Sequence, residues 1–187
     1  MKIIETGILD CYVIKPQVFG DERGFFYESF NEEKLINHGI PKYNWIQDNH
    51  SKSQYGVIRG LHYQLAPHAQ TKLVRVVTGA VIDNVIDLRE NSPTFGKQFR
   101  VELTEHNNTQ LLVPKGFAHG FSVISKQAEF LYKVDYPYVK EAEKSINPIN
   151  SGFDLDWGIK PTEAILSEKD NNAPDFKNCE RNFIYNS

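Results

Sequence analysis

The chain has 187 residues, with 21 Lys and Arg against 24 Asp and Glu, and a formal net charge of −3. This length predicts one domain over residues 1–187, large enough to fold without disulfides or a structural metal. The lack of a basic excess argues against nucleic acid as a partner. The longest apolar run, Cys11–Ile14, is far shorter than the roughly 20 residues that span a bilayer, and the N-terminus lacks a secretion signal. We therefore expect a cytoplasmic protein with no membrane partner.

A short helix is predicted over residues 31–39, where Asn31 can cap the first turn and Gly39 follows the last residue. A second helical signal covers residues 161–170, where Pro161 can open a turn and Ser167 begins an S-x-x-D capping pattern. Both signals lie outside the strand-rich middle of the chain. We expect short helices at the periphery of a β core.

Six segments in the middle of the chain predict short β-strands. They are rich in β-branched and aromatic residues and are separated by Gly, Asn and Pro at intervals of about ten residues. The six segments are residues 72–79, 80–88, 97–104, 109–114, 119–125 and 128–139. This regular spacing is typical of an antiparallel sandwich or barrel.

Polar side chains crowd the strand-like stretch at residues 56–76, among them Arg59, His62 and Lys72. In strict alternation Arg59 and His62 would face opposite sides of a strand. Both can line one pocket only if Gly60 permits a bulge or a bend. An edge strand with solvated polar groups is the alternative interpretation.

A second stretch, residues 111–123, places His119 between two glycines after a Pro-Lys-Gly turn. Cupins, which are small barrels that bind sugars or metals, use a similar P-x-G-x-x-H pattern. Their other motif supplies H-x-H, but here the sequence reads His62-Tyr63-Gln64. A catalytic metal needs about three protein ligands, so we predict a cupin-like domain without a metal. Cys11 and Cys179 form no CxxC pattern, and we expect incidental or structural thiols.

Seven blocks of the sequence, in order along nearly the whole chain, resemble the dTDP-4-dehydrorhamnose 3,5-epimerases of nucleotide-sugar biosynthesis. The blocks are residues 21–30, 47–64, 70–79, 87–96, 114–121, 130–138 and 166–170. The resemblance implies a mainly β, cupin-type jelly-roll barrel and a homodimer with shared N-terminal strands. It also implies a dTDP-linked 4-keto-6-deoxy sugar as substrate, no cofactor, and a place in dTDP-L-rhamnose synthesis for cell-surface polysaccharides.

The resemblance also assigns catalytic roles, which fit the chemistry of the substrate. Removing a hydrogen from C3 or C5 leaves an enolate whose charge rests on the C4 oxygen, and inversion needs a proton on the opposite face. By the motif match, His62 is the base, Asp170 orients it, Tyr132 is the acid and Lys72 lies near the oxyanion. Each residue has a structural alternative: Asp170 in a helix cap, Tyr132 and His62 in the core, and Lys72 at a solvated strand end.

The same match assigns substrate-binding residues. Arg23 and Arg59 correspond to contacts with the diphosphate, for which guanidinium groups are well suited. Phe19 and Phe26 are candidates for stacking on thymine or for the core. The other positions that match family binding residues are Glu28, Gln47, Asp48, Asn49, His119, Glu143 and Lys169.

One segment departs from the family pattern. After Ile146, where relatives usually have a tryptophan and an acid, this chain reads Asn147-Pro148-Ile149-Asn150. No proposed catalytic residue is lost there. The motifs do not fix how many centres are inverted, so a C3-only or C5-only epimerase stays an alternative to the double epimerase. A non-catalytic sugar-binding cupin and a metal-dependent cupin oxygenase are the remaining hypotheses.

Overall fold

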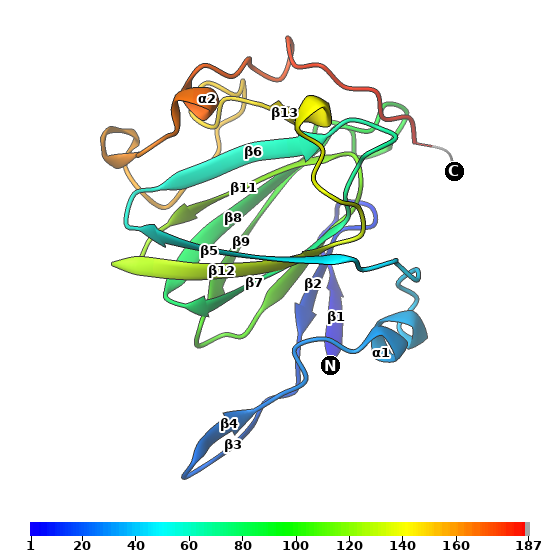
Figure 1. Cartoon of the computed structure of the whole chain (residues 1–187), viewed down its shortest axis with the longest axis vertical. Helices are drawn as coiled ribbons and strands as arrows, with labels where there is room; N and C mark the ends of the chain where they lie inside the picture. Colours follow the sequence, from blue (N-terminus) through cyan, green and yellow to red (C-terminus); the bar gives the residue numbers. More distant parts are fainter. Residues whose placement is uncertain (186–187) are drawn as a thin grey trace.

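Two antiparallel sheets form the body of the protein in a computed structural model that describes residues 1–185. One sheet has six strands, in the spatial order β1 (Lys2–Glu5), β2 (Tyr12–Lys15), β10 (Gln110–Val113), β7 (Lys72–Thr78), β12 (Gln127–Val134) and β5 (Gln47–Gln54). The other has five, in the order β13 (Glu143–Ser145), β6 (Ile58–Gln64), β11 (Phe117–Val123), β8 (Ala80–Asp87) and β9 (Gln98–Thr104). The predicted antiparallel sandwich or barrel is confirmed (Figure 1).

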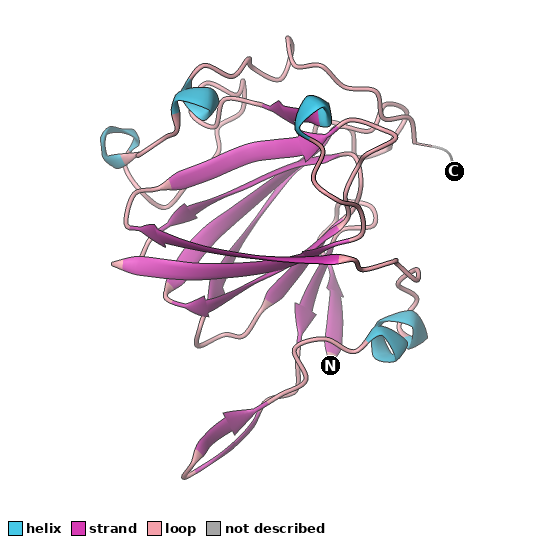
Figure 2. Cartoon of the chain, in the orientation of Figure 1, coloured by secondary structure: helices cyan, strands magenta, loops and turns pink. Residues whose placement is uncertain are grey.

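The remaining elements lie at the periphery (Figure 2). They are the hairpin of β3 (Phe19–Asp21) and β4 (Gly24–Phe26), the helices α1 (Glu32–Asn37) and α2 (Glu168–Asn171), and the 3₁₀ turns η1 (Lys140–Ala142) and η2 (Pro161–Glu163). Asn31 caps α1 as predicted, because its side chain accepts a hydrogen bond from the Lys34 N–H. The helical signal at 161–170 resolves into two separate turns, η2 and α2. None of the helices within residues 1–185 has the length and apolar character needed to cross a membrane.

The six strands predicted from the middle of the chain are all present as β7 to β12. Their inward side chains form the main core, with Val74 and Val76 from β7 packed near Phe121 of β11 and Phe130 of β12. The rings of Phe121 and Phe130 stack with centroids 4.1 Å apart and so join the two sheets.

The strand β6 contains the bulge that is needed for Arg59 and His62 to face the same side. His119 lies opposite His62 and Phe121 opposite Arg59, so β6 places two residues, Gly60 and Leu61, against the single Gly120 of β11. Gly60 has φ +124°, and a Cβ there would lie 2.7 Å from the carbonyl oxygen of His119. The close approach of the two backbones therefore requires glycine at position 60.

Substituting Gly60 by Ala should reduce the free energy of unfolding by about 2–5 kcal/mol, from the strained φ (roughly 1–2) and the backbone clash (roughly 1–3). Gly152→Ala is the matched control, because Gly152 has φ +88° but no atom within 4 Å of an added Cβ. For this control the free energy of unfolding should fall only by the part that comes from the strained φ, roughly 1–2 kcal/mol. Urea denaturation of both variants measures the difference, and equal losses would show that the clash does not matter.

Candidate active site

A cavity of about 260 Å³ lies between the two sheets. Its walls come from five strands: β5 and β12 with β7 on the six-stranded sheet, and β6 and β11 on the five-stranded sheet. The residues that line it are Asn49, His50, Ser51, Arg59, His62, Lys72, His119, Phe121, Phe130 and Tyr132. The bulge in β6 allows both Arg59 and His62 to reach this one cavity, as the sequence analysis required.

His62 of β6 is paired with Asp170 of α2, the short helix that lies beside this strand. The imidazole Nε2 lies 2.5 Å from the Asp170 Oδ1, and the Asp170 side chain is only 4% exposed. Burial would raise the pKa of Asp170, but hydrogen bonds from His62, Ser167 and the Gly60 N–H outweigh it and hold the pKa below its usual value. Asp170 is therefore an ionised carboxylate that can orient His62 and stabilise its protonated form.

Lys72 begins β7 and enters the cavity from the six-stranded sheet. Its ammonium group donates to the backbone carbonyl of His62 at 3.4 Å, so it lies beside the histidine. Burial lowers the pKa of Lys72 to about 8, although the charges of Asp83 and Glu143 oppose this effect. A cation held in such a site is suited to stabilise negative charge that develops in the cavity.

A second histidine–carboxylate pair lies deeper in the cavity. His119 Nε2 is 2.9 Å from Oδ2 of Asp83, and Asp83 is fully buried. Burial raises the pKa of Asp83, against the opposing effects of His119 and Lys72. The sequence analysis missed Asp83, although a carboxylate in the middle of the apolar strand at 80–88 was a signal, because buried charges need a partner.

Tyr132 faces the cavity from β12, on the wall opposite His62. Burial raises the pKa of its phenol, partly opposed by the positive charge of Arg59. The hydroxyl is therefore protonated at neutral pH and can donate a proton. Arg59 itself is exposed at the cavity rim and donates to Ser53 Oγ at 3.0 Å.

Glu143 and Lys169 form an ion pair between β13 and α2, close to His62. Burial would raise the pKa of Glu143, but hydrogen bonds from Lys169 and Tyr138 outweigh it and lower the pKa. The Tyr138 hydroxyl donates to Glu143 at 2.8 Å, and the Tyr138 ring is 54% exposed. Tyr138 is thus a large exposed aromatic residue beside the site that the sequence analysis did not select.

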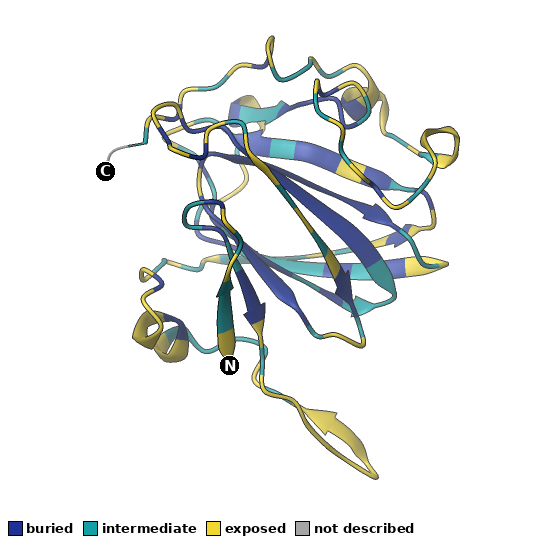
Figure 3. Ribbon diagram, turned by 180° about the vertical axis from the view of Figure 1, so that it is seen from behind, coloured by how far each residue is buried: buried dark blue, intermediate teal, exposed yellow. Residues whose placement is uncertain are grey.

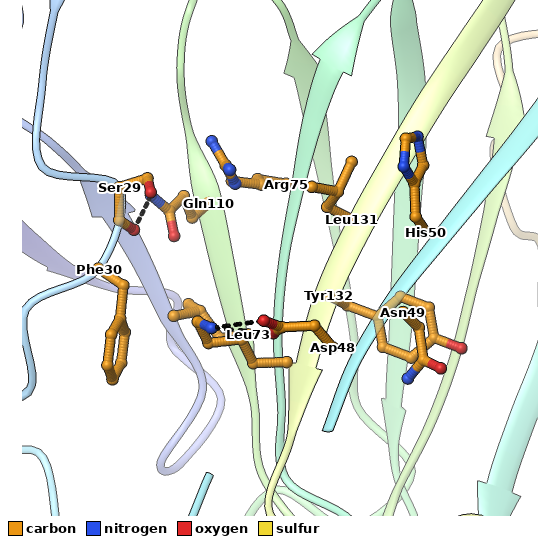
Figure 4. Close-up of a pocket in the computed structure, with 11 residues that line it drawn as sticks. Ser29, Phe30, Asp48, Asn49, His50, Leu73, Arg75, Gln110, Leu131 and Tyr132 are labelled. Atoms are coloured by element: carbon orange, nitrogen blue, oxygen red, sulfur yellow. Dashed lines mark hydrogen bonds and ion pairs between the residues drawn. The ribbon is translucent and has the colours of Figure 1, made fainter. Parts of the chain in front are cut away.

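The run Gln47-Asp48-Asn49 divides between the two faces of β5. Gln47 donates to the side chain of Asn49 at 2.8 Å on the cavity side. Asp48 points outward, where Lys133 binds it at 2.8 Å. Figure 4 shows this outer face, a groove of about 190 Å³ in which Gln110 donates to the Ser29 carbonyl. The structure therefore separates Asp48 from the cavity within one chain.

The predicted binding residues of the N-terminal segment lie away from the cavity. Arg23 stands at the turn of the β3–β4 hairpin, with its side chain 85% exposed and paired with Asp21. Phe26 is 69% exposed on the same hairpin, and Glu28 bonds to Asn31 and Lys34. The hairpin extends from the body as an exposed ribbon (Figure 3). One chain alone does not bring these residues to His62.

The position that a metal-binding cupin would fill with a second histidine is occupied by Gln64. Its amide donates to the carbonyls of His68 and Pro137 and accepts from the Val139 N–H. Gln64 therefore stabilises the chain segments at residue 68 and at residues 137–139. Within residues 1–185, no three His, Cys, Asp or Glu side chains converge as metal ligands. Cys11 and Cys179 are free and buried. That the reaction needs no metal or cofactor stays a prediction.

Comparison with known proteins identifies the family. The profile of the dTDP-4-dehydrorhamnose 3,5-epimerases matches residues 5–178. The chain is 48% identical to the dTDP-4-dehydrorhamnose 3,5-epimerase of Shigella flexneri, over 94% of this chain and 96% of that one. This chain belongs to the dTDP-4-dehydrorhamnose 3,5-epimerase family. The predicted family and enzyme class, an epimerase, are confirmed.

Solved structures of the family share the fold. The epimerase of Elizabethkingia anophelis superposes with a TM-score of 0.90 at 52% identity, covering 95% of this chain and 97% of that one. The enzyme of Legionella pneumophila, solved in complex with dTDP-4-keto-L-rhamnose, gives 0.89 at 43% identity, covering 95% and 93%. The prediction of a mainly β, cupin-type jelly roll is confirmed.

The burial of Lys72 predicts a measurable effect on stability. Its folded-state pKa of about 8 lies below its ordinary value of 10.5. Between these pH values the unfolded chain binds more protons, so stability from this group rises with pH, and the full burial cost is present below pH 8. Lys72→Met should raise the free energy of unfolding at pH 7 by roughly 2–3 kcal/mol and abolish this rise.

Urea denaturation at several pH values checks this effect, with Lys97→Met as the control because Lys97 is exposed. The control should leave the stability profile unchanged. A Lys72→Met variant that is less stable than the parent at pH 7 would show that the buried ammonium group is not a cost to folding.

Proposed function

We propose that the protein inverts C3 and C5 of dTDP-4-dehydro-6-deoxy-D-glucose and forms dTDP-4-dehydro-L-rhamnose. One observation carries the proposal: His62, with its ionised partner Asp170, and Tyr132 stand on opposite walls of one cavity. Inversion requires a base on one face of the sugar and an acid on the other. Family membership and the product-bound relative from Legionella pneumophila support the same substrate class.

Proton removal begins at His62. A hydrogen on C3 or C5 lies next to the C4 ketone, so its removal leaves an enolate with charge on the C4 oxygen. Asp170 holds the imidazole in place and stabilises the imidazolium that forms, as a carboxylate does in other His–Asp pairs. The ammonium group of Lys72, beside His62, stabilises the charge on the oxygen.

Tyr132 completes the inversion by donating its phenolic proton to the opposite face of the enolate. Its raised pKa keeps the hydroxyl protonated between turnovers. The positive charge of Arg59, which acts on the phenol, favours the phenolate that is left after donation. Before the second inversion, the His62 imidazolium must release its proton to solvent and the Tyr132 phenolate must take one up. The same two steps at the second carbon then invert the second centre.

Substrate binding is assigned to the polar groups around this cavity. Arg59 at the rim would bind the diphosphate with charge-assisted hydrogen bonds. His119 and Asn49 line the cavity from β11 and β5 and would contact the sugar there. The Glu143–Lys169 pair and Gln47 lie at the edges of the same site.

A homodimer accounts for the residues that one chain leaves outside the cavity. The exposed hairpin carries Phe19, Phe25 and Phe26, which are 57%, 65% and 69% exposed. Large apolar side chains gathered on a thin ribbon favour a partner surface. We propose that the hairpin packs on a second copy and delivers Arg23, Phe26 and Glu28 to its cavity, and that the outer face of β5 with Asp48 lies in the interface.

We further propose that residues 1–187 act as one domain in the cytoplasm. The second core cluster joins residues as distant in sequence as Ile58 and Phe183, which supports a single folding unit. A sugar nucleotide with a charged diphosphate does not cross a bilayer unaided, so the enzyme is expected where its substrate is made.

The roles of His62 and Tyr132 are separated by deuterium exchange in D₂O. Tyr132→Phe removes only the acid, so H3 and H5 should still exchange, provided the imidazolium of His62 exchanges its proton with solvent before returning it, while epimer formation falls by about 10²–10⁴-fold. His62→Ala should show neither exchange nor epimer. Proton NMR of the sugar follows both on one sample. Near-parent epimer formation by Tyr132→Phe would exclude Tyr132 as the acid, and exchange of only one hydrogen would indicate a single-centre epimerase.

Mixing two inactive variants tests the shared site. In a heterodimer of Arg23→Ala and His62→Ala subunits, one cavity would combine a native His62 with a native Arg23 from the hairpin of the other subunit. Refolding the two variants together should therefore restore up to about a quarter of the parent activity, whereas each alone stays low. Failure of the mixture to exceed the separate variants would argue against the shared hairpin.

A further inference from the structure

The two residues that follow β13 lie between the backbones of His62 and Asp170. Ile146 exchanges two hydrogen bonds with Leu61: its N–H donates to the Leu61 carbonyl at 2.9 Å, and the Leu61 N–H donates to the Ile146 carbonyl at 3.1 Å. Leu61 directly precedes His62. The chain at Ile146 is therefore fixed to the strand that carries the proposed base.

The next residue, Asn147, is bonded to the helix that carries Asp170, the partner of His62. Its side-chain amide donates to the carbonyl of Asn171 at 2.7 Å, and Asn171 directly follows Asp170 in α2. The backbone N–H of Asn147 donates to the Pro174 carbonyl at 2.8 Å, just beyond the same helix. Asn147 itself is only 5% exposed, whereas Asn171 and Pro174 lie at the surface. β13 and α2 both lie beside β6 (Figure 1).

The helix α2 needs such an attachment because it has only four residues. A single helical turn does not stay folded by itself, and its last carbonyls lack partners within the helix. Ser167 caps the first turn through the Asp170 N–H at 3.1 Å. The amide of Asn147 serves the opposite end by binding the Asn171 carbonyl.

We propose that Asn147 is a positioning residue for the epimerisation: it fixes α2 so that the Asp170 carboxylate stays within hydrogen-bond distance of His62. This inference rests on the roles proposed above for His62 and Asp170. Asn147 itself does not line the cavity and acts through Asp170. The segment 147–150, where this chain departs from the family pattern, thus supplies its own support for the His–Asp pair.

Asparagine suits this position because one short side chain provides both a donor and an acceptor. While Nδ2 donates to Asn171, Oδ1 accepts from the N–H groups of Ile149 at 3.0 Å and Asn150 at 2.8 Å. The Oδ1 atom thus fixes the loop conformation, and the Nδ2 group holds the end of α2. Aspartate has the same shape and keeps the acceptor half but lacks the donor.

Asn147→Asp therefore isolates the bond to Asn171. We expect kcat to fall by about 10- to 100-fold, the scale on which a displaced catalytic group loses rate, with KM within about twofold of the parent. Deuterium exchange at the sugar should slow by the same factor. Asn150→Asp is the matched control, because it adds the same charge three residues away on an exposed side chain and should leave kcat unchanged.

A double-mutant cycle with Asp170→Asn shows whether the effect passes through Asp170. If Asn147 acts only by holding Asp170, the double variant Asn147→Asp/Asp170→Asn should be no slower than Asp170→Asn alone. Circular dichroism and thermal unfolding accompany each variant. If Asn147→Asp does not fold, Asn147→Ser replaces it, since a hydroxyl can still shape the turn but is too short to reach Asn171.

Three results would overturn the inference. Parent kcat in a folded Asn147 variant, whatever its melting temperature, would make Asn147 a purely structural residue. Equal losses from the Asn147 substitution in the presence and absence of Asp170 would show that it acts elsewhere. Parent kcat in Asp170→Asn would remove the proposed His–Asp pair and this inference together, whereas a slow Asp170→Asn with a normal Asn147→Asp would remove this inference alone.

Discussion

The site depends on one geometric constraint, the close approach of β6 and β11 at Gly60 and Gly120. The extra residue in β6 changes which side chains face inward. Leu61 is fully buried in the second core cluster, while Arg59 and His62 on either side of the bulge both line the cavity. A regular strand would separate those two side chains by the pleat. The backbones come so close that glycine is required, so the local sequence, the strand geometry and the site are determined together.

Two of the buried carboxylates, Asp170 and Asp83, bond to histidines, and they differ in a way that assigns their tasks. Asp170 accepts hydrogen bonds from His62 and Ser167 as well as the Gly60 N–H, and these donors lower its pKa despite burial. Asp83 receives its hydrogen bond from His119, its Oδ1 has no partner among residues 1–185, and burial raises its pKa. Of these two, Asp170 is thus the one held firmly ionised, which a carboxylate needs in order to stabilise an imidazolium.

Strands were predictable from the sequence where packing alone determines the side chains. β7 to β12 are rich in β-branched and aromatic residues because they fill the core. β5 was missed because it reads QDNHSKSQ, and its inward residues face a polar cavity, so it lacks the apolar alternation that marks a strand. The hairpin β3–β4 was missed for the opposite reason, since its phenylalanines are exposed and the pattern carries no sign of what would cover them.

Asp170 shows why a local pattern could not decide between a structural and a chemical role. The S-x-x-D pattern indicated a helix start, and the Asp170 N–H does bond to Ser167 Oγ. The carboxylate of the same residue bonds to His62, which is 108 residues away in the sequence. The cap uses the backbone and the pairing uses the side chain, so the two interpretations are compatible. Capping begins the single turn of α2 at Ser167, and that start directs the carboxylate of Asp170 toward His62. In this protein the helix cap is therefore part of the support for the proposed base.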